Sequence, residues 1–414
     1  MGINATEAVW KLRRKCRCCG AEDIAPFLDL GKIPIADALL TNPQDEEAII
    51  PLSAAFCNGC CAVQVMEDVE ATSMFNAAYP YFTAANPALV KHFTDSAEHI
   101  IRQHNILTGQ LVIEVGSNDG TMLNVFKQHG MQVLGIDPSG PAESANKNGI
   151  RTIQDFFTHE LAGKLRMEGA SARLILANNV FAHVPEPNSM VLGWKELLAE
   201  DGLIIFEVPY LYDLITKLEF DTIFHQHYSY FSVHCLKSLL EKHGLYLNDV
   251  ERISIHGGSI RVTASAHKIN RTGVTALLAM EEAAGLTDFS LFHDFAERVK
   301  ALKSELQHLL MELKQQGKSI EGYGAAGKAN TLVNYVGIGS TYIHVIADKS
   351  THKQGKYFPG IKLPIVKTEE LLELHPDYIL ILAWNFADDI MRELEAYHSN
   401  GGKFIIPIPS LRIV

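Results

Sequence analysis

The sequence predicts an α/β protein with an N-terminal zinc-binding module followed by two Rossmann-like domains. Six of the seven cysteines lie between Cys16 and Cys61, which indicates one compact metal-binding module. Two later segments each combine an apolar strand, a glycine-containing loop and a helix start. The length of 414 residues also exceeds what one core usually holds. We therefore expect three parts, at residues 1–75, 76–270 and 271–414.

Composition narrows the class of protein. Apolar residues make up 47% of the chain and charged residues 20%, and no apolar run approaches the roughly 20 residues that span a bilayer. The N-terminal sequence "MGINATEAVWKLRRKC" lacks the apolar core of a signal peptide, which favours a cytoplasmic location. A formal net charge of −12 argues against a general nucleic-acid binder. We expect a monomer with neither a nucleic-acid nor a membrane partner.

The cysteine spacing predicts a structural zinc site. Cys16-x-x-Cys19 is followed about forty residues later by Cys57-x-x-Cys60, and four thiolates close a tetrahedral zinc site without an open position. A reducing compartment disfavours disulfides, although free buried cysteines are the alternative. Cys18 and Cys61 leave the register open, and the equal two-residue gaps favour Cys16, Cys19, Cys57 and Cys60. The metal would compensate for the small core of such a module.

The middle domain carries a cofactor-binding pattern. In "GQLVIEVGSNDGTML" an apolar strand ends at Glu114-Val115-Gly116, and a helix begins near Thr121. Asp137 ends the next strand, about twenty residues on, where an acid can accept hydrogen bonds from both hydroxyls of a ribose. The loop G-S-N-D-G differs from the G-x-G-x-x-G of dinucleotide sites, and Asp119 would repel a pyrophosphate. We therefore predict S-adenosylmethionine, a sulfonium with an amino-acid tail.

Two further strands place polar residues at the same sheet edge. The runs "ARLILANNVFAHVPEP" and "DGLIIFEVPYL" are apolar strands that end in polar residues, and ligands bind at that edge of such sheets. His183 is expected to line the edge, with a solvated loop histidine as the alternative. The predicted cofactor-binding residues are Glu114, Gly116, Asn118, Asp119, Asp137, Pro138, Asn178 and Asn179.

The cysteine knuckles and eight further segments, taken in order, resemble a known family. The paired cysteine knuckles, "YPYF", "IEVGSNDG", "ANNVFAHVP", "FEVPYL", "TIFHQHYSYFS", "IHGGSIR", "GYGAAGKAN" and "AWNFADD" together resemble the S-adenosylmethionine-dependent C-methyltransferases of deoxysugar biosynthesis, over nearly the whole chain. The resemblance implies methylation of carbon 3 of a nucleotide-linked 4-keto-deoxysugar. It also implies a zinc-binding module, a methyltransferase domain and a C-terminal Rossmann-like domain that helps to hold the sugar nucleotide.

The stretch "EFDTIFHQHYSYFS", from Glu219 to Ser232, is rich in titratable and aromatic residues. Attaching a methyl group to carbon requires removal of a proton next to a ketone, hence a base with a pKa near working pH and donors near the keto oxygen. The resemblance assigns the base to His227 and places a further histidine at His183. It also brings Tyr79 or Tyr81 into the pocket. The predicted catalytic residues are His227, His183, Tyr79, Tyr81, Gln226 and His225.

This stretch departs from the family at two positions. The family has tyrosine and glutamate where this chain has Phe224 and Gln226, so a hydroxyl and a carboxylate are missing. A carboxylate raises the pKa of a neighbouring histidine and fixes its tautomer, whereas an amide only orients it. Enolate stabilisation could pass to His225, His183 or Tyr79. Simple core packing is the alternative, and a metal site is disfavoured because His225 and His227 would point to opposite sides.

The C-terminal third predicts a helical connector and a second glycine loop. Helical spacing from about Thr272 to Gln316 places Leu302, Leu306, Leu309 and Leu313 on one stripe. Gly322-x-Gly324-x-x-Gly327 then opens a helix, and Asp348 ends the next strand. Alone this motif suggests a nicotinamide cofactor, but the resemblance assigns it to the nucleotide sugar, with Lys328 suited to a phosphate.

Lys349, Lys353 and Lys356 are candidates for the same diphosphate, although a lysine-rich loop is usually solvated. The predicted substrate-binding residues are Phe224, His256, Gly257, Gly258, Arg261, Tyr323, Lys328, Asn330 and Lys353. Two rival functions stay open at this point. One is other enolate chemistry on the same scaffold, such as epimerisation, and the other is non-catalytic binding of a nucleotide sugar.

Overall fold

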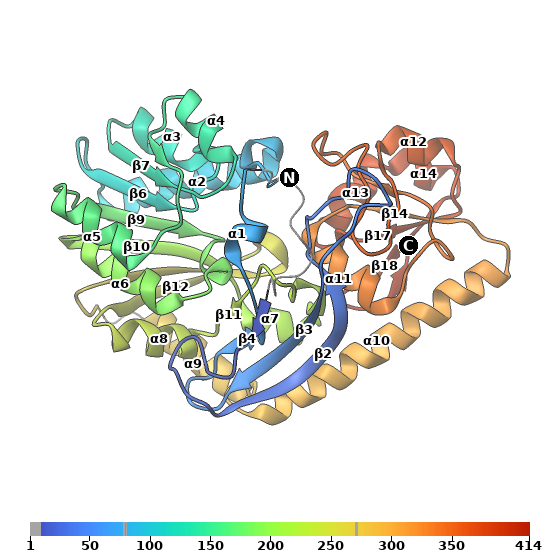
Figure 1. Ribbon diagram of the computed structural model, residues 1–414, viewed down its shortest axis with the longest axis horizontal. Coiled ribbons are helices and arrows are strands. Elements are labelled where there is room, and N and C mark those ends of the chain that lie inside the picture. The colour runs from blue at the N-terminus through green and yellow to red at the C-terminus, as the bar shows by residue number, and fades with distance from the viewer. Residues whose placement is uncertain (1–9, 78, 80, 270–271) are drawn as a thin grey trace.

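The computed structural model describes residues 10–77, 79, 81–269 and 272–414; of these, His256 is described by its backbone alone. Two lobes, each built around its own sheet, are bridged by the N-terminal strands and by one long helix, α10 (Phe289–Gln315) (Figure 1). The chain is thus an α/β protein with the predicted order of parts.

The N-terminal part forms a four-stranded antiparallel sheet in the order β11-β4-β3-β2. A bulge after Asp29 bends β2, where Gly31 adopts a φ of 78° that favours glycine. The edge strand β11 comes from the histidine-rich stretch: Ser229 pairs with Gln64 and Tyr230 with Val63. The strands of this part are β1 (Trp10–Leu12), β2 (Ile24–Pro34), β3 (Ile49–Cys57), β4 (Val63–Val65), β5 (Glu67–Val69) and β11 (Ser229–Tyr230), with β1 paired to β5.

The central sheet has seven strands in the order β12-β13-β10-β9-β6-β7-β8. The strands from β10 to β8 are parallel, and β13 runs antiparallel to both of its neighbours. The carboxyl ends of β6, β7 and β9 therefore meet at one edge, where a ligand can bind. The strands are β6 (Leu111–Val115), β7 (Gln132–Ile136), β8 (Thr152–Ile153), β9 (Ala172–Asn178), β10 (Leu198–Pro209), β12 (Tyr246–Ile253) and β13 (Ser259–Ser265).

Helices cover both faces of this sheet. One apolar cluster packs α2, α3 and α4 against it, and another packs α5, α6 and α8 against it. α3 begins at Thr121, where a helix start was expected. The helices of this region are α1 (Ala71–Met74), α2 (Pro87–His104), α3 (Thr121–Gln128), α4 (Pro141–Lys147), α5 (His159–Met167), α6 (Pro187–Leu197), α7 (Leu211–Thr216) and α8 (Val233–Lys242).

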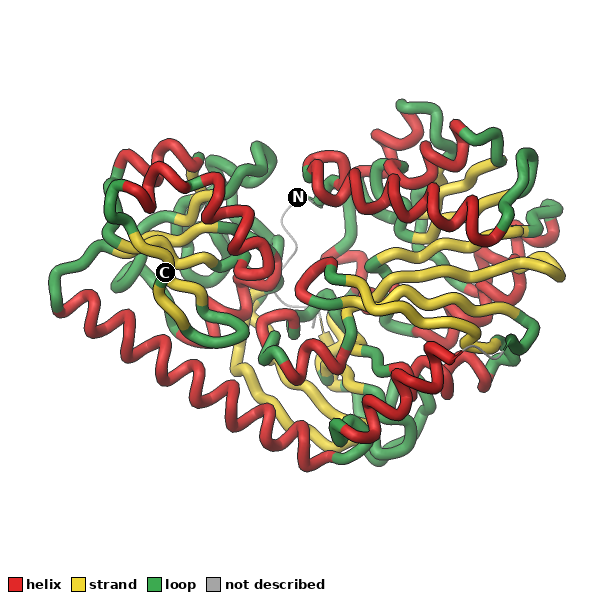
Figure 2. The backbone as a smooth tube through the Cα atoms, turned by 180° about the vertical axis from the view of Figure 1, so that it is seen from behind, coloured by secondary structure: helices red, strands yellow, loops and turns green. Residues whose placement is uncertain are grey.

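The connector is a helix pair, as predicted, with one residue corrected. α9 (Thr272–Ala283) precedes α10, whose inner face buries Leu302, Leu306, Leu310 and Leu313, whereas Leu309 is only partly buried. Leu310 is four residues after Leu306, which keeps it on the covered face of the helix. Figure 2 shows α10 from the opposite side, with the N-terminal strands lying along it.

The C-terminal sheet has six strands in the order β16-β15-β14-β17-β18-β19, parallel except for the last. Its strands are β14 (Ile320–Tyr323), β15 (Ile346–Ala347), β16 (Ile365–Val366), β17 (Tyr378–Ile381), β18 (Lys403–Ile406) and β19 (Arg412–Ile413). Its helices are α11 (Gly327–Val336), α12 (Thr368–Glu373), α13 (Ala387–Glu393) and α14 (Glu395–Ser399). The sheet of parallel strands with flanking helices agrees with a Rossmann-like domain.

One apolar core joins the N-terminal strands to the C-terminal domain. Phe56 of β3 stacks on Phe292 of α10, with ring centroids 4.5 Å apart and planes at 27°. The same cluster continues to Ile320 and Phe404 in the C-terminal sheet. Among the helices of the described part of the chain, none is both long and apolar enough to cross a membrane.

Candidate active site and zinc site

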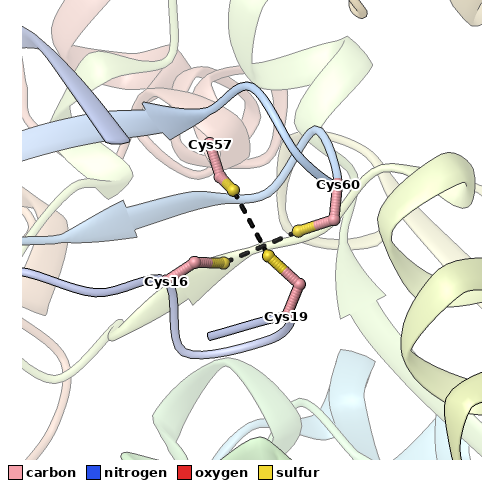
Figure 3. Close-up of side chains that lie close together, drawn as sticks. All are labelled: Cys16, Cys19, Cys57 and Cys60. Carbon is pink, nitrogen blue, oxygen red and sulfur yellow. Dashed lines mark hydrogen bonds between the residues drawn. The ribbon is translucent and has the colours of Figure 1, made fainter. Parts of the chain in front are cut away.

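The structure gathers the four predicted cysteines (Figure 3). Their Sγ atoms all lie within 4.8 Å of one another, and the Cys16–Cys60 and Cys19–Cys57 sulfur pairs are each 3.5 Å apart. Tetrahedral zinc with bonds of about 2.3 Å requires sulfurs about 3.8 Å apart, so this donor set fits zinc.

The remaining cysteines lie outside this four-sulfur cluster. Cys18 lies 3.7 Å from Cys235, sulfur to sulfur, and Cys61 packs against a different apolar cluster. Within each knuckle the backbone turns back on itself: Gly20 N donates to Cys16 O, and Cys61 N donates to Cys57 O. These turns aim both cysteines of each pair at one point.

A cavity of about 810 Å³ lies where the three parts of the chain meet. It reaches the carboxyl ends of β6, β7 and β9, and its volume is in the range of small-molecule sites. Of the predicted site residues, it is lined by Tyr79, Tyr81, Glu114, Gly116, Asn118, Asp137, Pro138, Asn178, Asn179, His183, Phe224, Gln226, His227, Lys328 and Lys353.

The glycine loop after β6 forms one wall. Gly116 has a φ of 68°, and an added Cβ would lie 2.7 Å from Cγ2 of Val180, so no larger residue fits. Asn118 ties this loop to the aromatic segment: its Oδ1 accepts from Thr83 N at 2.9 Å, and its Nδ2 donates to Tyr81 O at 3.0 Å. These two hydrogen bonds join the loop to the aromatic segment.

Asp137 holds this loop as well as lining the cavity. Its Oδ2 accepts from Asn118 N at 2.8 Å, and its Oδ1 accepts from Ser139 N at 2.8 Å. Oδ1 also accepts from Ser139 Oγ, so the capacity left for a ligand hydroxyl is on Oδ2, which has a second lone pair.

Three buried polar atoms beside this loop fit a polar ligand. Glu114 Oε2 and both amide atoms of Asn179 have no hydrogen-bond partner among the described residues. Burial, followed by the charges of Asp119 and Asp137, raises the pKa of Glu114 well above its usual range. Buried polar atoms of this kind are normally satisfied, so a bound cofactor is a natural partner.

Two of the predicted cofactor-binding residues, Asp119 and Asn178, form hydrogen bonds to other residues of the chain. Asp119 does not line the cavity; it accepts from Ala84 N at 2.8 Å and from Thr121 Oγ1 at 2.6 Å. It therefore fixes the start of α3 instead of reaching a ligand in the cavity. Asn178 lines the cavity, and its Nδ2 lies 3.0 Å from Sδ of Met122.

His183 and His227 form a pair in the cavity, with ring centroids 4.6 Å apart. Nδ1 of His227 donates to Thr222 O at 2.9 Å, and Nδ1 of His183 donates to Gln226 O at 2.8 Å. Because carbonyl oxygens only accept, each neutral ring keeps its lone pair on Nε2. Burial lowers the pKa of His183 to about 4, so this ring is neutral at pH 7. His183 is thus part of the cavity wall, and the solvated alternative does not describe it.

Aromatic rings surround the two imidazoles. Phe224 lies 4.1 Å from the His227 ring, and Phe75 meets His183 edge-on at 5.3 Å, centroid to centroid. Tyr79 packs on Phe75, and burial raises the pKa of Tyr79 well above its usual range, which keeps its hydroxyl protonated. Phe75 was not among the predicted residues; its position next to the "YPYF" motif was the available signal.

Gln226 and His225 point to different surroundings. Gln226 Nε2 donates to Ala36 O, and its Oε1 is buried without a hydrogen-bond partner in the described part of the chain. His225 is fully buried, its Nε2 lies 3.0 Å from Pro51 O, and it does not line the cavity. His225 was among the predicted catalytic residues, but its ring faces the N-terminal sheet instead of the cavity that holds His183 and His227.

The C-terminal domain contributes two lysines to the cavity. Lys328 Nζ is buried 4.3 Å from the Trp384 ring centroid and has no hydrogen-bond partner among the described residues. Lys353 Nζ donates to Ala325 O at 2.7 Å and lies 3.7 Å from Oδ1 of Asp37. Both lysines thus line the cavity from the C-terminal domain.

Apart from His256, the other predicted substrate residues do not line the cavity. Arg261 is paired with Glu207, Nη2 to Oε1 at 2.7 Å, and Asn330 Nδ2 donates to Pro34 O at 2.8 Å. The Tyr323 hydroxyl is 3.1 Å from Oγ1 of Thr368. Gly257 and Gly258 pack against Glu219 and Asp213 respectively, and the side chain of His256 is outside the described part of the chain.

Two acids at the start of the histidine-rich stretch were missed by sequence reasoning. Burial raises the pKa of Glu219 to about 7 and that of Asp221 to about 6, against the charge of Lys328. Asp221 Oδ2 accepts from Trp384 Nε1 at 2.7 Å. Their only sequence signal was two acids inside the apolar run "LEFDTIF".

The sheet order, the glycine loop with its acid after β7 and the cysteine site define an S-adenosylmethionine-dependent methyltransferase with a zinc module. Family models match residues 16–75 ("Putative zinc binding domain"), 95–250 ("Methyltransferase domain") and 254–409 ("C-methyltransferase C-terminal domain"). The chain is 35% identical over 407 residues to the C-methyltransferase NovU of Streptomyces niveus, covering 97% of this chain and 96% of that protein. The chain therefore belongs to the C-methyltransferase family.

Partial matches are also found. A ubiquinone biosynthesis O-methyltransferase of Pasteurella multocida (strain Pm70) is 31% identical over 120 residues, which cover 26% of this chain and 50% of that protein. The solved structure of magnesium protoporphyrin IX methyltransferase (ChlM) from Synechocystis PCC 6803 with bound SAM aligns with a TM-score of 0.34 and 17% identity, covering 43% of this chain and 80% of that one. Each match covers less than half of this chain.

Proposed function

We propose that this C-methyltransferase methylates carbon 3 of a nucleotide-linked 4-keto-deoxysugar through an enolate. The observation that carries the proposal is the histidine pair. Two imidazoles with their lone pairs on Nε2 share one cavity with the glycine loop and with two lysines. A base beside the cofactor loop is what C-methylation needs, because a carbon nucleophile must first lose a proton.

His227 is the base in this proposal. Its Nε2 removes the proton from the carbon next to the ketone, and the Thr222 carbonyl, accepting from Nδ1, stabilises the resulting imidazolium. Tyr79 keeps its proton and can donate to the developing enolate oxygen. His183 has a low basicity, so it serves better as a neutral neighbour that orients the substrate.

The cofactor side is proposed from the polar groups of the glycine loop. When bound, S-adenosylmethionine supplies an electrophilic methyl group. Asp137 would accept from its ribose, and Glu114 and Asn179 would satisfy its polar groups with atoms that lack partners in the described part of the protein. The aromatic segment with Tyr79 and Tyr81, joined to the loop through Asn118, would cover this side of the bound cofactor.

The substrate side is proposed from the lysines. Lys328 and Lys353 bring positive charge into a cavity of a protein with net charge −12, which suits the diphosphate of a nucleotide sugar. Lys328 Nζ has three N–H donors and no hydrogen-bond acceptor among the described residues, so an anionic oxygen would satisfy it.

Methyl transfer from labelled S-adenosylmethionine to a panel of nucleotide-linked 4-keto sugars tests the proposal. We expect label on the carbon next to the ketone, and solvent deuterium at that carbon when the cofactor is omitted. Deuterium incorporation without methylation at any cofactor concentration would point to epimerisation instead. Label on oxygen or nitrogen, or on no member of the panel, would overturn the assignment of substrate.

A further inference from the structure

We propose that Arg17, which lies inside the first cysteine knuckle, is a positioning residue for the histidine pair. This inference rests on the proposed roles of His183 and His227. The Arg17 side chain is fully buried although it carries a charge. Burying a guanidinium is costly unless hydrogen bonds and an opposite charge compensate for it, so its contacts show what it holds. Nη1 and Nη2 make these contacts, whereas Nε has no hydrogen-bond partner among the described residues.

One guanidinium contacts both segments that carry the imidazoles. Nη1 donates to Pro185 O at 3.1 Å, two residues after His183. Cζ lies 4.9 Å from the ring centroid of Tyr228, the residue that follows His227. Arg17 therefore fixes the distance between the two chain segments whose histidines meet in the cavity.

The other end of the guanidinium is anchored in the N-terminal part. Nη2 donates to Val65 O at 3.1 Å and forms an ion pair with Asp68. Asp68 is itself held by Arg13, whose Nε lies 2.8 Å from Oδ2. The charge is thus neutralised, and the anchor is β4, which is directly paired with β11.

The backbone of Arg17 is fixed as firmly as its side chain. Its N–H donates to Gln64 Oε1 at 2.8 Å, and its carbonyl accepts from Asn188 Nδ2 at 2.6 Å. Because Cys16 precedes it and Cys19 follows two residues later, a metal held by the knuckle sets the place from which the side chain starts. The zinc module would in this way determine the geometry of the catalytic pair.

A planar guanidinium is required for these contacts. It presents donors in a rigid fork and a flat face to an aromatic ring, whereas a lysine ammonium is a compact charge that can reach only part of this set. A merely structural side chain would support folding without affecting the imidazoles. A positioning residue would change their environment while the protein stays folded.

The test compares Arg17→Lys and Arg17→Met with the wild type, using zinc-containing protein with ¹⁵N-labelled histidine. Arg252→Met is the control, because Arg252 also pairs with an acid, Asp213, and stacks on Tyr212. None of its contacts among the described residues reaches the segment of His183 or that of His227. ¹⁵N NMR spectra of the imidazole nitrogens report the tautomers. Substitution of His183 and His227, one at a time, assigns their signals.

We expect both Arg17 variants to bind S-adenosylmethionine within twofold of the wild type, to keep zinc in Arg17→Lys, and to shift the signals of His183 and His227. A misplacement of about 1 Å lowers kcat on the order of 100-fold, so kcat should fall by about that factor with little change in KM. Unchanged imidazole spectra in zinc-containing Arg17→Lys would overturn the proposal. This readout needs no sugar substrate, so it stands apart from failure of the proposed reaction.

Discussion

Replacing His227 with asparagine isolates its basic nitrogen. The Nδ2 of asparagine can take the place of Nδ1 and keep the hydrogen bond to Thr222 O, which is 2.9 Å long in the wild type. The variant therefore loses the lone pair on Nε2 while the loop keeps its anchor. Loss of a general base costs roughly 100- to 10,000-fold in rate.

The neighbouring imidazole, His183, can replace the lost base only in part. His183 is only 4.6 Å away, ring to ring, but its pKa of about 4 makes it a weak base. We therefore expect kcat to fall by about 1,000-fold, which corresponds to about 4 kcal/mol of transition-state free energy.

Initial rates of label transfer at saturating substrate measure this loss, and calorimetry measures S-adenosylmethionine affinity, which should not change. His183→Asn is the matched control, since its amide can likewise keep the bond to Gln226 O. Near-normal turnover in His227→Asn with an inactive His183→Asn would refute the reasoning. So would a wild-type pH–rate profile whose acid limb lies near pH 4, the pKa of His183.

Four further predictions follow from contacts described above. Cys57→Ser should release the zinc and loosen the N-terminal part, and elemental analysis that finds no zinc in wild-type protein purified without chelator would contradict this. Asp137→Ala should weaken S-adenosylmethionine binding by roughly 1.5–3 kcal/mol for each hydrogen bond lost, measured by calorimetry; unchanged affinity would place the cofactor elsewhere. Burial raises the pKa of Asp221 from 3.8 to about 6, so the folded state binds its proton more tightly, and stability should fall as pH rises from about 4 to 6. Asp221→Asn should remove up to about 3 kcal/mol of that fall, as followed by urea unfolding at both ends of the range, and an equal fall in both proteins would refute it. Lys328→Met should raise KM for the nucleotide sugar by about 10-fold or more, whereas Lys349→Met, which lies on the surface beside Glu393, should not; equal KM values for both variants would argue against a diphosphate contact.

Local patterns predicted the parts of the site that depend on local chemistry. The two-residue gap within each cysteine pair favours one ligand set, because two cysteines at this spacing can bind the same zinc ion. The four favoured cysteines lie together in the structure. The glycine loop was equally readable, because parallel strands bring their carboxyl ends to one edge. Gly116, Asp137 and Asn179 accordingly lie on one cavity wall.

Residues whose neighbours are distant in sequence could not be placed in this way. Arg261 forms an ion pair with Glu207, which is 54 positions away. Asn330 donates a hydrogen bond to the carbonyl of Pro34, which is 296 positions away. Their polar side chains suggested ligand contacts because nothing local showed that a partner already existed. His225 was misplaced for a similar reason: its surroundings are the N-terminal sheet, which no pattern near residue 225 reveals.

The pairing of β11 with β4 has a consequence for how the chain folds during synthesis. The first part to leave the ribosome cannot complete its sheet until Ser229 and Tyr230 have emerged, so the edge of β4 stays open in the meantime. The ring of Phe56 likewise stays uncovered until Phe292, on which it stacks, has been synthesised. An open strand edge and exposed apolar rings favour association with other chains. We infer that the N-terminal part, although it is made first, is completed only after Phe292 of α10 has emerged, and that a fragment ending near residue 75 will aggregate instead of folding alone.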